Sequence, residues 1–351
     1  MKIEELIEEV LNQNASDLHL SVNLPPTIRV DGYLRSLNQY SKLSPTEIKD
    51  LTFSILNDIQ KEILIRDKEI DFSFSHGDIA RFRANAYHQK GCLSLALRLI
   101  PVKIRTIDEL GVPKICNRFT EYSQGFVLVT GPTGHGKSTT LAAMVDKINE
   151  EKGGHIITVE DPIEYNHVNK KAIIAQRELH YDTRSFASAL RAILREDPDV
   201  VLVGEMRDLE TISTAITIAE TGHLVFATLH TNNATQTVDR IIDVFPAHQQ
   251  QQIRTQLAGI LVGIVSQRLI PAIGGGRVVA SEILMINSAA RNIIREAKTH
   301  QLEAVIQTGA DQGMQTIDSD LARLVRSGKI SMDEARNYAL DLHQLERYLM
   351  K

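Results

Sequence analysis

The sequence contains no tryptophan, only two cysteines and no long apolar segment. Cys92 and Cys116 support neither a disulfide framework nor a zinc site. The longest apolar run, residues 257–265, falls far short of the roughly 20 residues that a membrane-spanning helix needs. A formal net charge of −5 gives no overall attraction to nucleic acid or anionic lipid. We expect a cytoplasmic protein without a signal peptide, because residues 1–11 are acidic and amphipathic.

What the chain does contain is typical of a globular protein of about two domains, with 351 residues of which 43% are apolar. Residues 1–100 combine helical patterns at 3–11 and 44–65 with strand-like segments, which predicts a small antiparallel α+β domain. Asp31-Gly32 is a dipeptide favoured in tight hairpin turns. The strands are expected at residues 17–22, 27–30, 33–37, 69–75, 80–89 and 92–99.

Residues 101–113, bracketed by prolines, are predicted to link this domain to an α/β domain over residues 114–286. Short apolar strands alternate there with helices, which indicates a mainly parallel sheet covered on both faces. Residues 249–265 and 287–351 are expected to be helix-rich. The strands are expected at 126–129, 155–159, 200–203 and 224–229, and the helices at 138–151, 185–195, 209–221 and 234–244.

One motif dominates the second domain. A buried strand at 126–129 leads into Gly131, and four residues later come Gly136, Lys137 and Ser138, followed by a helical pattern. This is the spacing and context of a phosphate-binding P-loop. The residues expected to contact a nucleotide are Gly131, Pro132, Thr133, Gly134, His135, Gly136, Lys137, Ser138 and Thr139.

Each part of that motif has a chemical task. Glycines let backbone N–H groups turn toward an anion, and the N-terminus of the following helix adds partial positive charge. Lys137 would reach the β- and γ-phosphates of ATP, and the Ser138 hydroxyl would hold Mg²⁺. The alternative, a chance glycine-rich turn, does not account for strand, spacing, Lys-Ser and helix together. The motif therefore predicts nucleoside triphosphate binding.

Polar residues follow three other expected strands of the same sheet. They are Glu164 after 155–159, Glu205 after 200–203, and His230 after 224–229. Water that attacks a γ-phosphate needs an acceptor, and the metal needs a nearby carboxylate, so Glu164 and Glu205 could divide these tasks. The alternatives are an N-cap for Asp161, a solvated loop for Glu164 and an ordinary core histidine for His230.

Two arginines stand out in the first domain. Arg83 and Arg98 lie on neighbouring expected strands, with Arg81 on the face of Arg83 as a weaker candidate. The segment alone favours a pair of solvated charges at a sheet edge. A positive surface directed at a neighbouring subunit's phosphates is the alternative.

At this point the sequence resembles the secretion-type ATPases, and within them the branch that retracts type IV pili. The similarity extends from about residue 16 to 328. The blocks that carry it are the P-loop at 131–139, an aspartate box at 156–165, an atypical Walker B motif at 194–210, a histidine box at 221–231, and the C-terminal segments 281–286, 289–296 and 306–316. His135 stands where that family often has serine.

The resemblance implies roles for individual residues. Lys137 and Ser138 match the P-loop pair, with Ser138 and Glu205 as the residues nearest Mg²⁺. Glu164 matches the glutamate proposed as catalytic base, and Glu205 the Walker B glutamate. His230 matches the histidine of its box. Arg83 and Arg98 match arginines thought to complete a neighbour's site.

The resemblance also implies architecture and partners. It predicts a RecA-like P-loop ATPase domain, a PAS-like N-terminal domain and a helical C-terminal region at 287–351. The family assembles as homohexamers that work with an inner-membrane platform protein and, indirectly, with pilin. We accordingly expect a motor peripheral to the cytoplasmic membrane, at its inner face, with no nucleic-acid partner. The spacing of residues 289–296 predicts one short helix with a basic stripe of Arg291 and Arg295. It either packs for stability or, as the resemblance implies, couples the ring to the pilus machinery.

Several other functions are compatible with parts of this pattern. The pilus-assembly ATPases of the same superfamily usually carry a further N-terminal domain and a four-cysteine zinc insertion, neither of which this sequence shows. An accessory retraction paralogue is harder to separate by sequence. A DNA translocase should show a basic channel with stacking aromatics, and a non-enzymatic scaffold would not need both Glu164 and Glu205.

Overall fold

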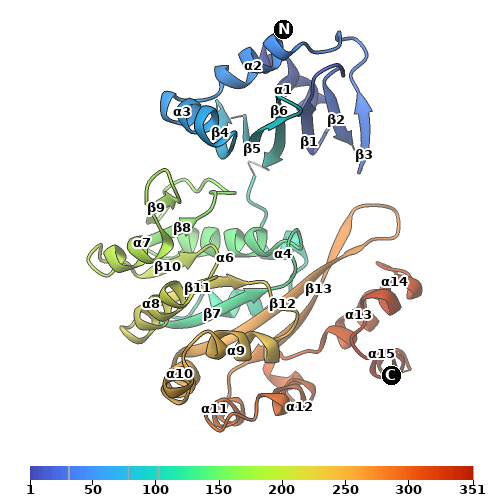
Figure 1. Ribbon diagram of the computed structural model, residues 1–351. Helices are drawn as coiled ribbons and strands as arrows, with labels where there is room; N and C mark the ends of the chain where they lie inside the picture. Colours follow the sequence, from blue (N-terminus) through green and yellow to red (C-terminus); the bar gives the residue numbers. More distant parts are fainter. Residues whose placement is uncertain (31, 78, 101–102, 351) are drawn as a thin grey trace. The chain divides into compact units, whose positions relative to one another are not determined.

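The structure is a computed structural model that describes residues 1–30, 32–77, 79–100 and 103–350 (Figure 1). Internal contacts divide the chain into two compact units. The first comprises Met1–Lys103 with Glu164–Asn166, and the second comprises Ile104–Ile163 with His167–Lys351. The boundaries expected at residues 100, 113 and 286 stay predictions, and the first two residues of the expected linker, 101 and 102, lie outside the described residues.

The first unit is an antiparallel sheet with helices, as predicted. Its strand order is β3-β2-β1-β6-β5-β4. The strands are β1 (Asp17–Leu20), β2 (Thr27–Val30), β3 (Tyr33–Ser36), β4 (Glu69–His76), β5 (Ala80–Gln89) and β6 (Cys92–Ile100), and the helices are α1 (Ile3–Asn12), α2 (Pro45–Ser54) and α3 (Asp58–Asp67). Asp31 of the expected hairpin turn lies outside the described residues.

The single helix expected over 44–65 is wrong, because two helices occupy this segment. Asn57 forms a capping box at the start of α3. Its side chain accepts a hydrogen bond from the Gln60 amide (2.9 Å), and the Gln60 side chain accepts one from the Asn57 amide (3.0 Å). These bonds satisfy amides that a new helix start leaves open, so they favour a break over a continuous helix.

The second unit contains a seven-stranded sheet of order β13-β12-β7-β11-β10-β8-β9, parallel except for β13. The carboxyl ends of its parallel strands therefore meet at one edge, where ligands of such sheets bind. The strands are β7 (Gly125–Thr130), β8 (Gly154–Glu160), β9 (Ala172–Glu178), β10 (Val200–Val203), β11 (Leu224–Leu229), β12 (Leu261–Pro271) and β13 (Arg277–Met285).

Helices surround this sheet, and the expected α/β class is confirmed (Figure 1). The central strands β7, β10 and β11 are buried along their whole length, which explains their continuous apolar sequences. The helices are α4 (Ile107–Leu110), α5 (Ile115–Phe119), α6 (Lys137–Glu151), α7 (Phe186–Ile193), α8 (Leu209–Glu220), α9 (Ala234–Asp243), α10 (Ala247–Ile260), α11 (Ser288–Arg295), α12 (Leu302–Thr308), α13 (Ile317–Arg326), α14 (Met332–Tyr338) and α15 (Leu342–Leu349).

The helix-rich character expected for 249–265 holds only as far as Ile260, where α10 ends and β12 begins. An apolar run of this length cannot be assigned to helix or buried strand by periodicity. Packing decides it here, since β12 lies between β7 and β13. A Cβ at Gly263 would lie 2.5 Å from the Phe119 ring, so the strand depends on a glycine at that position.

The C-terminal helices pack on the hairpin formed by β12 and β13 (orange in Figure 1). Asp320, which is buried, accepts a hydrogen bond from the Ser281 amide of β13 (2.9 Å). Asp318 accepts from the amides of Leu340 (2.9 Å) and Asp341 (3.2 Å), which fixes the turn between α14 and α15. None of the helices within the described part of the chain is both long and apolar enough to cross a membrane.

Glu282 is a buried carboxyl that supports the polar edge of the sheet from β13. Its Oε1 accepts a hydrogen bond from the Ala234 amide (2.7 Å), the first residue of α9, four positions after His230. Burial raises the pKa of Glu282 from 4.5 to about 7, against the effect of that hydrogen bond. Glu303 and Asp318 raise the pKa further, and Arg268 lowers it.

This burial predicts a pH-dependent stability. Between pH 4.5 and about 7 the folded Glu282 keeps a proton that the unfolded chain releases, so the free energy of unfolding falls as pH rises through this window. Glu282→Gln removes the titration but keeps an acceptor for Ala234. Urea unfolding should show the variant gaining about 2–3 kcal/mol on wild type between pH 5 and pH 8. Glu121→Gln, at an exposed position that does not influence the pKa of Glu282, should show no such gain. Parallel pH profiles for wild type and Glu282→Gln would contradict this assignment.

Candidate functional site

The P-loop joins β7 to α6 at the polar edge of the sheet. Gly136 caps α6 in the left-handed region (φ +81°), and the helix begins at Lys137. Gly131, at φ +141°, has no room for a side chain, since a Cβ there would lie 2.3 Å from the Gln267 carbonyl oxygen. The helix α6 begins directly after the loop, as the motif predicted.

Gln267 of β12 holds the P-loop through its side chain. The sequence had not singled out this residue. Its side-chain Nε2 donates to the His135 carbonyl (2.7 Å), and its Oε1 accepts from the Thr140 hydroxyl (2.9 Å). The side chain is buried, so these two bonds determine the orientation of its amide. The polar triplet at 266–268 inside an apolar strand was the available signal.

His135 adds a second bond between the loop and β12. Its Nδ1 accepts a hydrogen bond from the Leu269 amide (2.9 Å), which requires that nitrogen to be unprotonated. Burial lowers the pKa of His135, and the positive charges of Lys137, Arg268 and Arg277 lower it further. His135, which stands where the family often has serine, is therefore uncharged at neutral pH and holds the P-loop to β12.

The structure brings three predicted residues together beside the loop. Lys137 is buried, and its Nζ donates to the carbonyls of Gly131 (2.9 Å) and Pro132 (3.0 Å). The same Nζ lies 3.5 Å from Nδ1 of His230. On the other side of the imidazole, His230 Nε2 lies 3.6 Å from Glu205 Oε2. Lys137, His230 and Glu205 thus form one continuous polar row.

Electrostatics of this row keep its histidine neutral. Burial lowers the pKa of His230 first, and Lys137 lowers it further, while Glu205 acts in the opposite direction. Arg207, which the sequence analysis did not single out, holds the other oxygen of Glu205 (Nε–Oε1 2.7 Å). Thr133 of the P-loop lies 3.3 Å from His230 Nδ1. His230 is therefore a polar residue of the site rather than an ordinary core histidine.

Ser138 and Thr139 occupy the first turn of α6 and are both half-buried. A hydroxyl at this position can bind Mg²⁺ that also contacts nucleotide phosphates. Within the described ranges, no cluster of three or more His, Cys, Asp and Glu side chains is arranged to hold a metal ion. A metal here would have to take most of its ligands from phosphate and water.

Glu164 is placed differently from the polar row. It groups with the first unit, whereas Lys137, His230 and Glu205 belong to the second. The alternative role of Asp161 as a helix N-cap is wrong, because no helix follows it before β9. The proposed role of Glu164 as catalytic base stays a prediction.

Arg83 and Arg98 face each other across β5 and β6, but the expectation that they sit at a sheet edge is wrong. The edge strands of this sheet are β3 and β4. Both arginines are exposed, as the sequence suggested. Arg98 donates from Nε to Asp17 Oδ1 (2.9 Å), a pairing set by strand register. Burial alone would raise the pKa of Asp17, but hydrogen bonds from Ser16 and Arg98 lower it.

Known proteins with similar sequences and structures identify the relatives of this chain. A family model described as type II/IV secretion system protein matches residues 1–337. The chain is 51% identical over 339 residues to the type IV pilus retraction ATPase PilT of Pseudomonas aeruginosa, covering 97% of this chain and 98% of that protein. It is 38% identical over 340 residues to the type IV pilus ATPase PilU of the same organism, covering 97% and 89%. A crystal structure of the pilus retraction motor PilT with bound ADP matches at a TM-score of 0.93 and 48% identity, covering 99% of each chain.

The support that Gln267 gives the P-loop can be tested directly. Gln267→Leu leaves the His135 carbonyl and the Thr140 hydroxyl without their buried partner, at a cost of about 1–3 kcal/mol. We expect a lower unfolding temperature and a Kd for a fluorescent ATP analogue raised about tenfold, equal to about 1.4 kcal/mol. Gln252→Leu makes the same change at an exposed position of α10 and should alter neither. Wild-type affinity in folded Gln267→Leu would rule out the support.

Proposed function

The chain belongs to the family of type II/IV secretion system proteins, and we propose that it is the motor that retracts type IV pili in twitching motility. It is an ATPase and binds nucleotide. The observation that carries the proposal is the high identity to a retraction ATPase over nearly the full length of both chains. The lower identity to PilU favours the principal retraction ATPase over an accessory paralogue.

We propose that Lys137 releases its loop carbonyls to bind the β- and γ-phosphates of ATP. Its Nζ already lies inside the loop, where it donates to the carbonyls of Gly131 and Pro132. Ser138 would hold Mg²⁺, which when bound neutralises phosphate charge. Glu205 is oriented by Arg207 and would face this centre next to His230. When Lys137 moves to bind phosphate, the neutral imidazole of His230 would lose its contact with the Lys137 Nζ.

Glu164 is proposed as the base that orients the attacking water. Its carboxyl follows β8 in the sequence, and β8 lies next to β10, which carries Glu205 at its end. The assembly proposed is a homohexamer in which Arg83 and Arg98 complete a neighbour's site. The ring would act at the inner face of the cytoplasmic membrane on an inner-membrane platform protein and, through it, on pilin.

The function is tested by activity and by complementation. The purified chain should hydrolyse ATP with Mg²⁺ and show no stimulation by DNA. Expressed in a strain that lacks its own retraction ATPase, it should restore twitching, and Lys137→Ala should not, because that variant loses the phosphate contact. Severalfold stimulation by DNA would favour a translocase. Full ATP turnover of a well-expressed chain without restored twitching would contradict the retraction role.

The trans assignment predicts complementation between two inactive chains. Arg98→Ala and Glu164→Gln should each lower turnover by at least about a hundredfold. Mixing them should recover part of the activity, because some interfaces then pair two intact halves. Asp17→Asn is the matched control, since it removes the negative charge that pairs with Arg98 without removing the arginine.

Two different results would contradict the trans role of Arg98. If Asp17→Asn alone reproduces the loss seen in Arg98→Ala, the arginine supports its own sheet rather than a neighbour's site. If mixtures that demonstrably exchange subunits stay inactive while Asp17→Asn is active, the trans role is lost.

A further inference from the structure

The three residues Glu164–Asn166 lie between two anchored residues of the second unit. On one side, the Ile163 amide donates to Glu178 Oε2 (3.2 Å). On the other, the His167 amide donates to Gln176 Oε1 (2.8 Å). Both acceptors belong to β9, which pairs in parallel with β8. The chain that carries Glu164 is therefore hydrogen-bonded to side chains of β9 on both sides, at Ile163 and His167.

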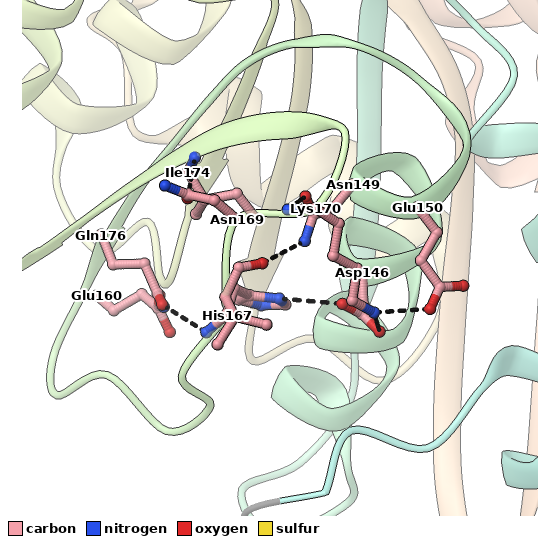
Figure 2. A network of polar contacts seen from close by, with 10 residues as sticks. Asp146, Asn149, Glu150, Glu160, His167, Asn169, Lys170, Ile174 and Gln176 are labelled. Carbon is pink, nitrogen blue, oxygen red and sulfur yellow. Dashed lines mark hydrogen bonds and ion pairs between the residues drawn. The ribbon is translucent and has the colours of Figure 1, made fainter.

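Immediately after this segment, the loop is attached to α6 by the buried side chain of Asn149 (Figure 2). Asn149 donates from Nδ2 to the Val168 carbonyl (2.8 Å) and accepts at Oδ1 from the Lys170 amide (3.0 Å). Its own carbonyl accepts from the Lys171 amide (2.9 Å). One helical residue thus holds the loop backbone at three positions, 168, 170 and 171.

Charge reinforces this attachment. Lys170 Nζ donates to Asp146 Oδ2 (2.9 Å) and Glu150 Oε1 (2.6 Å), which lie one turn apart on α6. The His167 side chain, which is almost fully buried, lies with Nδ1 3.9 Å from Asp146 Oδ1. Figure 2 shows both side chains converging on Asp146 from the loop. We call Asp146, Asn149, Glu150 and Lys170 the α6 clasp.

The helix that bears the clasp also begins at Lys137, the residue that binds phosphate. An α-helix is rigid over its length and rises about 1.5 Å per residue, so the clasp and the phosphate site keep a fixed separation. The loop residues attached to this helix, 168–171, therefore keep a fixed distance from the P-loop. Asp146, Asn149 and Lys170 contact neither the P-loop nor the polar row in the hydrogen bonds described above.

We propose that the α6 clasp positions the loop of Glu164 for catalysis, with Lys170 and Asn149 as positioning residues. The inference rests on the proposed role of Glu164 as base. A misplacement of a reacting group by about 1 Å can cost up to about a hundredfold in rate. Loosening the clasp should accordingly lower kcat while leaving ATP affinity, which depends on the P-loop, unchanged.

Lys170→Met removes both ion pairs from a partly exposed side chain and should leave the fold intact. We expect kcat to fall about tenfold, with the Kd for ATP within about twofold of wild type. Lys170→Arg can keep both pairs and should restore most of kcat. Lys147→Met is the matched control, because it removes an ion pair to Glu151 on the same helix without touching the loop.

A double-mutant cycle separates positioning from general stability. In a Glu164→Gln background, measured by single-turnover hydrolysis, Lys170→Met should have no further effect if Lys170 acts through Glu164. A tenfold loss that persists in this background would overturn the proposal, as would an unchanged kcat in Lys170→Met. Should Glu164→Gln alone retain full turnover, the base assignment fails first, and that result is visible before the cycle is completed. Asn149→Ala, checked for folding by its unfolding temperature, should reproduce the Lys170→Met pattern.

Discussion

A loop that binds phosphate must leave its backbone amides open, so its shape has to be held by groups outside it. In this protein the side chain of Gln267 meets that requirement. It joins the His135 carbonyl to the Thr140 hydroxyl, in effect tying the loop to the first turn of α6. Gly131 completes the fit by letting the backbone lie against the Gln267 carbonyl. Together with the bond from the Leu269 amide to His135, this buried amide holds the P-loop to β12.

The strand that carries Gln267 also connects the site to the C-terminal helices. Successive residues of a strand point to opposite faces of a sheet. Gln267 faces the P-loop, and the next residue, Arg268, donates to the Tyr338 carbonyl at the end of α14 (2.8 Å). The neighbouring strand contributes Ser281, whose amide is bound by Asp320 of α13. Helices α13 and α14 therefore pack on the same hairpin that contacts the P-loop.

The sequence predicted those features that local patterns encode. The P-loop, the alternation of strands and helices, and the grouping of Lys137, Glu205 and His230 follow from spacing and from strands that end at one edge. Gln267 could not be placed, because its partners lie more than a hundred positions away in the sequence. The pairing of Arg98 with Asp17 likewise depends on strand register, which no local pattern specifies. Tertiary packing, rather than propensity, also decided where α10 gives way to β12.

The anchored segment between Ile163 and His167 has a consequence for how such sequences can change. Both anchors are side chains of β9, so the segment closes a short loop on one strand. Substitution at these positions alters chemistry while the path of the chain stays the same. Lengthening a closed loop adds to its ordering cost only slowly, whereas loss of either anchor would release the chain that carries Glu164. The two anchors are thus under tighter physical restraint than the number of residues between them.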